Sequence, residues 1–226
     1  MTARKLIIAI DGPAGAGKST VARHLAAHFG LLNLESGAMY RAFALKALSQ
    51  SISPDDAGAL TSLASQTRIE LEPTPTGNRV LLDGADVTAE LRDPTVTQAA
   101  SRVSVHPAIR HWLVGLQRAM GEQGGVVMEG RDIGTVVFPN ADLKFFLDAS
   151  PEARSQRRYL EAPAKTTTSE ALKEELRQRD ERDRNRAESP LRPAPDALVI
   201  DSTELTLDEV LAKIEQITAR HASRTH

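Results

Sequence analysis

Residues 12–20 read GPAGAGKST, and the apolar run KLIIAI stands just before them at residues 5–10. The segment fits the spacing G-x-x-x-x-G-K-[ST], whose glycines let consecutive backbone N–H groups converge on phosphate oxygens. A helix that begins near Lys18 would point its positive dipole end at the same anion. A strand, a glycine-rich turn and a helix are therefore predicted in the order that a phosphate-binding loop requires.

The phosphate-binding loop is expected to hold a nucleoside triphosphate. Lys18 would reach the β- and γ-phosphates, and Ser19 would bind Mg²⁺ through its hydroxyl, partly through waters. A dinucleotide-binding turn is excluded, because Thr20 stands where that pattern needs a third glycine. The residues expected to bind the nucleotide are Gly12, Pro13, Ala14, Gly15, Ala16, Gly17, Lys18, Ser19 and Thr20.

The composition is that of a globular chain with one core domain and room for an insertion. Of the 226 residues, 41% are hydrophobic and 26% charged, which allows a substantial core. The net charge of −2 argues against nucleic acid or an anionic membrane as a partner. The absence of cysteine excludes disulfides and thiolate catalysis. Since the first apolar run is too short for a signal peptide or a membrane span, we expect a cytoplasmic protein.

Short apolar segments alternate with helical patterns along most of the chain. This alternation predicts an α/β fold of the P-loop NTPase type, with a parallel five-stranded sheet flanked by helices. The expected strands are residues 6–10, 31–34, 125–128, 143–147 and 197–200. The expected helices are the one that begins near Lys18 and stops at Gly30, and those at residues 38–48, 107–120, 151–160, 169–184 and 207–219.

About ninety residues separate the second and third expected strands, far more than an ordinary crossover needs. Within them, residues 67–90 hold alternating segments joined by TPTGN and DG turns, which predict a small antiparallel sheet. We therefore expect residues 37–120 to form an inserted domain for a second substrate. The core would then consist of residues 1–36 and 121–226.

Arginines cluster around residues 161–168, EAPAKTTT, which we interpret as a mobile loop within a lid of about residues 154–168. Two predicted helices flank this loop, and each carries charged residues spaced to share one face. Those before the loop are Arg154, Arg157 and Arg158, and those after it are Arg179, Asp183 and Arg186. Ion pairs on two solvated helices would give the same pattern. Downstream of a phosphate loop, we favour arginines that neutralise a phosphoryl group in transfer.

Two further segments bear on what happens to the phosphate. GVVMEGRD, residues 125–132, resembles a strand that ends in a Mg²⁺-binding carboxylate, with Glu129 and Asp132 beyond the strand and Arg131 between them. LESGAMYRA, residues 34–42, offers Ser36 as a helix N-cap and Arg41 as an anion-binding residue on the first turns. A GTPase is disfavoured, because no asparagine is followed by lysine.

With these segments together, the chain resembles the bacterial cytidylate kinases, which are nucleoside monophosphate kinases with a P-loop. The resemblance covers nearly the whole chain and rests on IAIDGPAGAGKS, SGAMYR, GRDIGTVVFP, RDRNR and LVIDST. SGAMYR and GRDIGTVVFP are more specific than the phosphate loop, which many families share. The resemblance implies that the insertion is the monophosphate-binding domain of this family.

The resemblance also implies roles for single residues. Arg41, Arg131 and Arg186 match the residues that hold the α-phosphate of the acceptor, and Ser36 and Tyr40 belong to the same substrate-binding set. Ser101, Arg110 and Asp132 match the residues that read cytosine, although Ser101 alone would pass for an ordinary helix serine. Arg179 and Asp183 match residues at the sugar. Arg154, Arg157 and Arg158 match the lid arginines that close on the transferring phosphate.

The reaction implied is direct, in-line transfer of the γ-phosphoryl group of ATP·Mg²⁺ to CMP or dCMP. We expect a monomer, because the sequence shows no clear interface stripe. An aspartate that accepts a hydrogen bond from the 4-amino group of cytosine would reject uracil, which has a carbonyl there. Two alternatives stay open: a kinase for UMP or a small hydroxyl metabolite, and a P-loop regulator that hydrolyses ATP. His24 and His28, at i and i+4, have metal-binding spacing, but no carboxylate or third histidine is indicated beside them.

Overall fold

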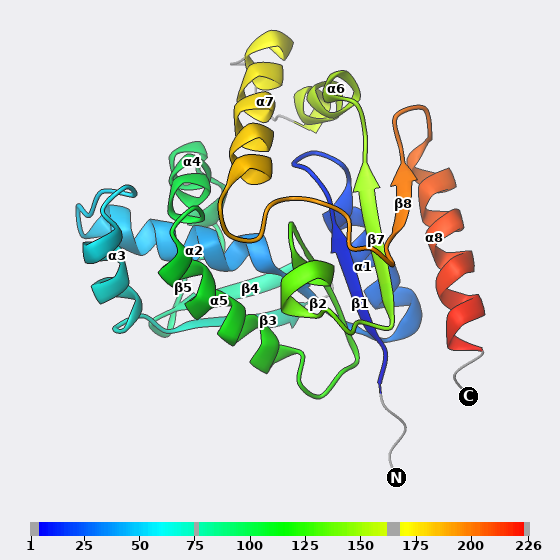
Figure 1. The fold of residues 1–226 in the computed structure, drawn as a ribbon, viewed down its shortest axis with the longest axis horizontal. Helices are drawn as coiled ribbons and strands as arrows, with labels where there is room; N and C mark the ends of the chain where they lie inside the picture. The colour runs from blue at the N-terminus through cyan, green and yellow to red at the C-terminus, as the bar shows by residue number, and fades with distance from the viewer. Residues whose placement is uncertain (1–4, 75–76, 162–167, 224–226) are drawn as a thin grey trace.

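The computed structural model describes residues 5–74, 77–161 and 168–223 (Figure 1). Its centre is a five-stranded parallel sheet in the order β2-β6-β1-β7-β8. Each strand begins within one residue of its expected start, so the predicted fold class is confirmed. The strands are β1 (Ile7–Asp11), β2 (Leu32–Glu35), β6 (Val126–Gly130), β7 (Leu143–Asp148) and β8 (Leu198–Asp201).

Both faces of the sheet are buried, as the continuous apolar runs predicted. Side chains alternate along a strand, so Ile8 and Ile10 of β1 point to one face and Ala9 to the other. The first face packs against α1 (Lys18–Phe29) and α8 (Leu207–Ala222) through a core that contains Leu25 and Ile214. The second packs against α5 (Pro107–Met120) and a short π-helical turn, η2 (Ile133–Val137).

The helices around the core begin and end where local signals predicted. Gly30 adopts a left-handed φ of 64° at the end of α1, a conformation that glycine reaches without steric cost. The helices α6 (Pro151–Glu161) and α7 (Ser169–Asn185) lie over the carboxyl ends of β1 and β7 (Figure 1). Residues 162–167, most of the loop expected between them, lie outside the described residues.

Residues between β2 and β6 gather on one side of the molecule, beyond the β2 edge of the sheet (Figure 1). They have a hydrophobic cluster of their own, in which Phe43 meets the edge of Trp112 at 5.2 Å between ring centroids. Asn78 joins this region to β2, because its amide donates to the Asn33 carbonyl (2.7 Å) and accepts from the Glu35 N–H (2.9 Å). The elements are α2 (Ser36–Ser49), α3 (Ala57–Ala64), β3 (Ile69–Thr74), β4 (Gly77–Leu82), β5 (Ala85–Asp86), a 3-10 turn η1 (Glu90–Arg92), α4 (Pro94–Val103) and α5.

The antiparallel sheet expected over residues 67–90 is present as β3-β4-β5. Two helices, α3 and α4, were not predicted. The start of α4 carried a signal, since Asp93 caps the helix through the Thr95 N–H and Pro94 occupies the first turn. Helix α3 is only eight residues long, which is too short to have a distinct pattern. Among the described residues, no helix has both the length and the apolar character needed to cross a membrane.

Candidate functional site

The phosphate loop connects β1 to α1 and requires glycine where other elements approach it. A Cβ on Gly12 (φ 146°) would lie 2.0 Å from the Leu147 carbonyl oxygen of β7. Gly17, the N-cap of α1, is left-handed with a φ of 91°. The loop thus turns sharply away from the sheet and places the N-terminus of α1 at the carboxyl edge of the sheet. A helix N-terminus favours an anion.

Lys18 is buried beneath this loop, and its Nζ donates to the Pro13 carbonyl (2.7 Å). Burial, with the nearby positive charge of Arg131, lowers the pKa of Lys18 to about 7. Burial also lowers the pKa of Arg179 to about 10, again with Arg131 contributing. Cations that depress one another's pKa would be stabilised by a bound polyanion.

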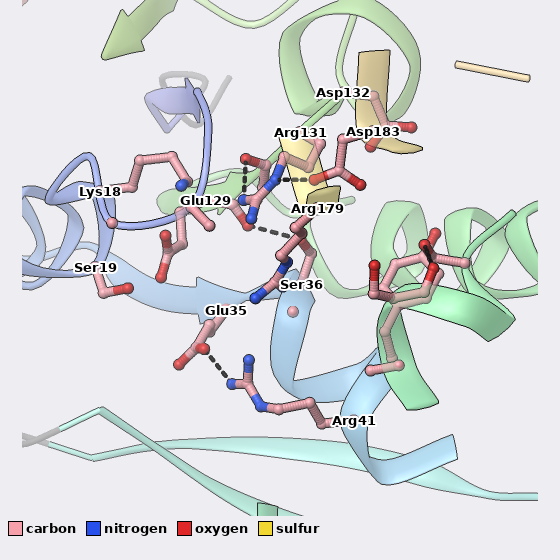
Figure 2. A pocket seen from close by; sticks show the side chains of 18 of the residues that line it. Lys18, Ser19, Glu35, Ser36, Arg41, Glu129, Arg131, Asp132, Arg179 and Asp183 are labelled. Carbon is pink, nitrogen blue, oxygen red and sulfur yellow. Dashed lines mark hydrogen bonds and ion pairs between the residues drawn. The ribbon is translucent and has the colours of Figure 1, made fainter. Parts of the chain in front are cut away.

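Most of the expected site residues line one cavity, called the central cavity below. Figure 2 shows side chains from the phosphate loop, β2, α2, β6 and α7 converging on it. The expected residues that line it are Ala14, Gly15, Lys18, Ser19, Ser36, Tyr40, Arg41, Ser101, Arg110, Arg131, Asp132, Arg158, Arg179, Asp183 and Arg186. They come from segments more than 150 residues apart, so the fold alone brings them together.

Arg110 and Asp132 form a buried ion pair at one end of the central cavity. The Arg110 Nη1 also donates to the Ser104 carbonyl (3.1 Å), and its guanidinium carbon lies 5.7 Å from the centre of the Tyr40 ring. Burial raises the pKa of Tyr40 to about 12, so this hydroxyl stays protonated. The Arg110–Asp132 pair is therefore held in position by the Ser104 carbonyl and the Tyr40 ring.

Several buried polar atoms of the central cavity lack a hydrogen-bond partner among the described residues. They are the Tyr40 hydroxyl, the Ser101 Oγ, the Arg110 Nε and the Arg186 Nη2. Buried polar groups without a partner are rare in folded proteins and call for an explanation. Here they belong to residues that the resemblance assigns to the substrate, so a small polar ligand would satisfy them.

A second set of charges crosses the cavity from β6 to α7. Arg131 donates from Nε to the Asp183 carboxylate (2.8 Å), and Arg186 Nη1 lies 3.7 Å from the same carboxylate. The Nε of Arg186 donates to the Ser189 carbonyl (2.6 Å). Because each guanidinium keeps other N–H groups, this array can still bind an anion while its own aspartate holds it in position.

Ser36 and Arg41 differ in part from their expected geometry. Ser36 is not the N-cap of α2, because the helix starts directly from β2 and Glu35 takes the cap position. The Ser36 Oγ instead donates to the Glu129 carbonyl (2.7 Å). Arg41 is paired with the Glu35 carboxylate, and both side chains line the central cavity (Figure 2).

The three arginines of α6 do not point into one common site. In the described structure, Arg158 lines the central cavity and Arg154 and Arg157 do not. Arg154 is 1% exposed and donates to the Ala14 carbonyl (2.9 Å) and to Asp180 of α7 (2.6 Å). Arg157 donates to the Ser202 Oγ (3.0 Å), beside a second hollow.

That second hollow adjoins the other side of the phosphate loop. Ala16, Gly17 and Thr20 of the loop line it, together with Arg157. The rest of its lining is largely apolar: Val21, Leu147, Leu205, Leu207 and Val210, with Ser202. It offers a flat guanidinium, an apolar wall and access to the phosphate loop.

Three carboxylates lie near the phosphate loop: Glu129, which the sequence indicated as a possible Mg²⁺ ligand, and Glu35 and Asp11, which received no role from the sequence. Glu129 lies within β6, not beyond it, and burial, together with the nearby Glu35, raises its pKa. Glu35 ends β2 and lines the central cavity. Asp11 accepts from the Ile133 N–H (2.8 Å) and the Gly134 N–H (2.7 Å), which fixes η2 against β1. Their shared signal was a carboxylate at the carboxyl end of a buried strand.

His24 and His28 have the carboxylate neighbour that the sequence did not indicate. Glu215 of α8 lies 2.8 Å from the His24 Nε2 and 3.6 Å from the His28 Nε2. The expectation that no carboxylate stands beside these histidines is wrong. Glu215 is almost two hundred residues away along the chain, and it approaches only because α1 and α8 pack on the same face of the sheet.

Comparison with known proteins gives one consistent family. The family model described as cytidylate kinase matches residues 8–220. The cytidylate kinase of Symbiobacterium thermophilum is 49% identical over 98% of this chain and 98% of its own length. The cytidylate kinase of Geobacillus thermodenitrificans is 50% identical over 95% of this chain and 96% of its own length.

Proposed function

This chain belongs to the cytidylate kinase family, and we propose that it transfers the γ-phosphoryl group of ATP to CMP or dCMP, giving the diphosphate and ADP. The observation that carries the proposal is the central cavity, where a phosphate loop faces a buried, incompletely hydrogen-bonded set of acceptor-binding groups. The two halves correspond to the two nucleotides of such a reaction.

We assign the base of the acceptor to Ser101, Arg110 and Asp132. Cytosine has an amino donor beside a ring nitrogen and a carbonyl, both acceptors. The Asp132 carboxylate would accept from the amino group, while the Arg110 Nε and the Ser101 hydroxyl would donate to the acceptors. The missing protein partners of those two donors support the assignment. Uracil would set its carbonyl against the Asp132 carboxylate, and the two acceptors would repel.

We assign the α-phosphate of the acceptor to Arg41, Arg131 and Arg186, with Ser36 and Tyr40 beside them. Three guanidinium groups around one cavity offer charge-assisted hydrogen bonds to its oxygens. Arg179 and Asp183, which come from one face of α7, would hold the sugar. The ion pairs of Arg131 and Arg186 with Asp183 support a sugar close to the phosphate.

We assign the donor triphosphate to the phosphate loop, Gly12 to Thr20, with Lys18 at its β- and γ-phosphates. The second hollow supports a position for the donor base, between the guanidinium of Arg157 and the apolar side chains of Leu205 and Leu207. Arginine stacks on flat aromatic rings. In this arrangement Arg157 reaches the donor at its base rather than at the transferring group.

Mg²⁺ fits the oxygen donors beside the phosphate loop. The Ser19 hydroxyl, whose interaction partner is Glu129, and the carboxylates of Glu129 and Glu35 are hard ligands of the kind that Mg²⁺ prefers. Ser19, with Glu129 and Glu35 beside it, would hold the ion, partly through waters. When bound, Mg²⁺ neutralises charge on the donor phosphates.

The chain's own contribution to transfer is to position two anions and exclude water. The acceptor phosphate is already an anion, so no general base is needed, and transfer is direct and in line. Lys18 and Arg158, which both line the central cavity, would neutralise the group in transit. Arg154 would act by fixing the Ala14 carbonyl of the phosphate loop to α7.

We further propose that residues 37–120 act as the acceptor domain and about 154–168 as a lid, on a core of 1–36 and 121–226. The separate hydrophobic cluster of the region between β2 and β6 supports the first boundary. Closure of both over the cavity would keep water from the γ-phosphate. We expect a cytoplasmic monomer without nucleic-acid or membrane partners, and light scattering of the purified protein tests the monomer.

Product analysis with ³¹P NMR tests transfer against hydrolysis. With ATP, Mg²⁺ and CMP, we expect CDP and ADP in equal amounts and almost no inorganic phosphate. With ATP alone, turnover should nearly stop. Steady release of inorganic phosphate that ignores CMP would indicate a P-loop regulator instead, and transfer to a small hydroxyl metabolite with CMP inert would indicate a metabolite kinase.

A further inference from the structure

Away from the central cavity, two histidines of α1 and a glutamate of α8 meet on the surface. His24 and His28 are four residues apart, so their rings lie on one side of α1. Glu215 stands on the facing side of α8, beside the packed core residues of the two helices. The three side chains are between 32% and 47% exposed, which leaves them open to ions in solution.

The donor atoms of these residues already converge. One carboxylate oxygen of Glu215 lies 2.8 Å from the His24 Nε2, and the other lies 3.6 Å from the His28 Nε2. The three ligand atoms lie within 4.8 Å of one another. A tetrahedral zinc ion with ligands at roughly 2.0–2.2 Å needs donors about 3.3 Å apart. Small side-chain rotations would therefore suffice to surround an ion.

The two imidazole rings are held in related orientations. Their centroids lie 6.0 Å apart and their planes differ by 27°. Both rings extend from the rigid backbone of one helix, so their spacing does not depend on a loop. Two histidines at i and i+4 on a helix form a known basis for zinc coordination, to which a carboxylate from elsewhere adds a third ligand.

We propose that His24, His28 and Glu215 form a surface site for a divalent transition metal of the Zn²⁺ class. Imidazole nitrogens select Zn²⁺, Ni²⁺ or Cu²⁺ over Mg²⁺, which prefers oxygen ligands. The site is therefore distinct in chemistry from the Mg²⁺ site proposed at Ser19. Three protein ligands leave a fourth position for water.

A metal at this site would join two helices that are distant in sequence. Helix α1 begins at the phosphate loop, and α8 is the last helix of the described chain. None of the three residues lines the central cavity or the second hollow. Binding of the transition metal should thus stabilise the fold. Substitution of the three residues should leave the phosphoryl transfer reaction unchanged when no transition metal is added.

The competing interpretation is an ordinary hydrogen-bonded cluster, in which Glu215 serves only to pair with the two rings. The two interpretations differ in what Glu215→Gln does. A glutamine keeps a hydrogen bond to His24 but is a much weaker ligand for a transition metal. If Glu215 is a metal ligand, Glu215→Gln should weaken metal binding. If Glu215 only pairs with the two rings, Glu215→Gln should leave the metal affinity unchanged.

Isothermal titration of the full-length, untagged, chelator-treated protein with Zn²⁺ tests the proposal. The titration uses no nucleotide and an excess of Mg²⁺, so that oxygen sites are occupied. We expect one Zn²⁺ per chain, with affinity lowered by at least about tenfold in both His28→Ala and Glu215→Gln. The control His111→Ala removes a histidine of α5 that is 72% exposed, and it should bind as tightly as wild type.

Thermal unfolding supplies a second readout. At a hundredfold excess of Zn²⁺ over its Kd, Tm should rise by about 5–10 °C in wild type and in His111→Ala. Glu215→Gln, which should retain its kinase activity and hence its fold, should show at most about half of that rise at the same Zn²⁺ concentration. The proposal is overturned if wild type does not bind Zn²⁺, or if His28→Ala and Glu215→Gln bind it as wild type does.

Discussion

At the scale of single residues, Asp132 carries the specificity of the proposed site. It is buried, paired with Arg110 and within 3.9 Å of Arg186, so its carboxylate is held in position. A fixed acceptor on this side of the cavity suits the amino group of cytosine and opposes the carbonyl of uracil. Its effect should appear in the choice of acceptor rather than in the use of ATP.

Asp132→Asn should lower kcat/KM for CMP by about tenfold to a hundredfold, the loss expected for one charge-assisted hydrogen bond. The amide can turn its NH₂ toward a carbonyl, so activity with UMP should rise relative to CMP. Steady-state kinetics with both acceptors measures this change, and the KM for ATP serves as the control. An equal loss in CMP and ATP parameters would assign Asp132 to folding or metal binding.

Lys18 should link ATP binding to pH. In the free protein, burial and the charge of Arg131 hold the pKa of Lys18 near 7, so the amine is mostly neutral at pH 8. The phosphates of ATP favour the charged form and raise this pKa, so binding takes up a proton. Affinity for ATP should therefore fall as pH rises from 7 to 9.

Calorimetry at pH 8 in two buffers of different ionisation enthalpy measures the proton uptake directly. Lys18→Met should abolish most of it and should also slow turnover, since the ammonium stabilises the transferring group. Proton uptake by Lys18→Met equal to that of wild type would mean that another group titrates on binding.

At the scale of elements, Arg154 joins three of them: the phosphate loop, α6 and α7. Its guanidinium is almost fully buried against the carbonyls of Ala14 and Ala149 and the carboxylate of Asp180. The arginines of α6 therefore do not share one role. Arg154 contacts the phosphate loop, and Arg158 lines the central cavity.

Arg154→Met should lower the free energy of unfolding by about 3–5 kcal/mol, because it leaves Asp180 buried without its partner. Urea denaturation monitored by circular dichroism measures the change. Arg177→Met is the matched control on α7: its pairs with Glu174 and Glu181 are exposed, and its loss should leave the stability unchanged within error. Equal effects of the two substitutions would contradict the anchoring role.

The five strands and the helices of the core could be predicted because each carries its own local pattern. β1, the phosphate loop and α1 are contiguous, so spacing alone fixed their order. Helix α4 could have been found from Asp93 and Pro94. The short helix α3 is capped in the same way by Asp56, which accepts from the Ala59 N–H (3.0 Å), but its eight residues are too few to show a periodic pattern.

The acceptor site could be assigned from the sequence only through the family resemblance. Nothing local marks Ser101 or Arg110, which come from different helices and meet Asp132 only in the folded chain. For the same reason, the contacts of Glu215 with His24 and of Asp180 with Arg154 could not be predicted from the sequence. Partners on different elements leave no shared spacing, whereas residues on one helix, such as Arg179 and Asp183, do.

At the scale of the whole molecule, the central cavity draws on the phosphate loop, the region between β2 and β6, and α7. A ligand that contacts all three should hold the parts of the molecule together. CMP at a hundredfold excess over its Kd should stabilise the fold by about 2.7 kcal/mol, which is a Tm increase of about 5–10 °C.

Differential scanning fluorimetry measures that shift, with UMP at the same concentration as the matched ligand. UMP should raise Tm much less. Arg110→Met, which removes a base-binding group, should reduce the response to CMP. An identical response in this variant would mean that the nucleotide binds elsewhere.

Selection of cytosine by the central cavity can be measured as the ratio of kcat/KM for CMP to kcat/KM for UMP. One coupled assay with ATP and Mg²⁺ supplies both values for the wild-type protein. An aspartate that faces the amino group predicts a ratio of at least about a hundred, from one lost hydrogen bond and one acceptor–acceptor repulsion. A ratio near one would contradict the assignment of Asp132, Arg110 and Ser101 to the base.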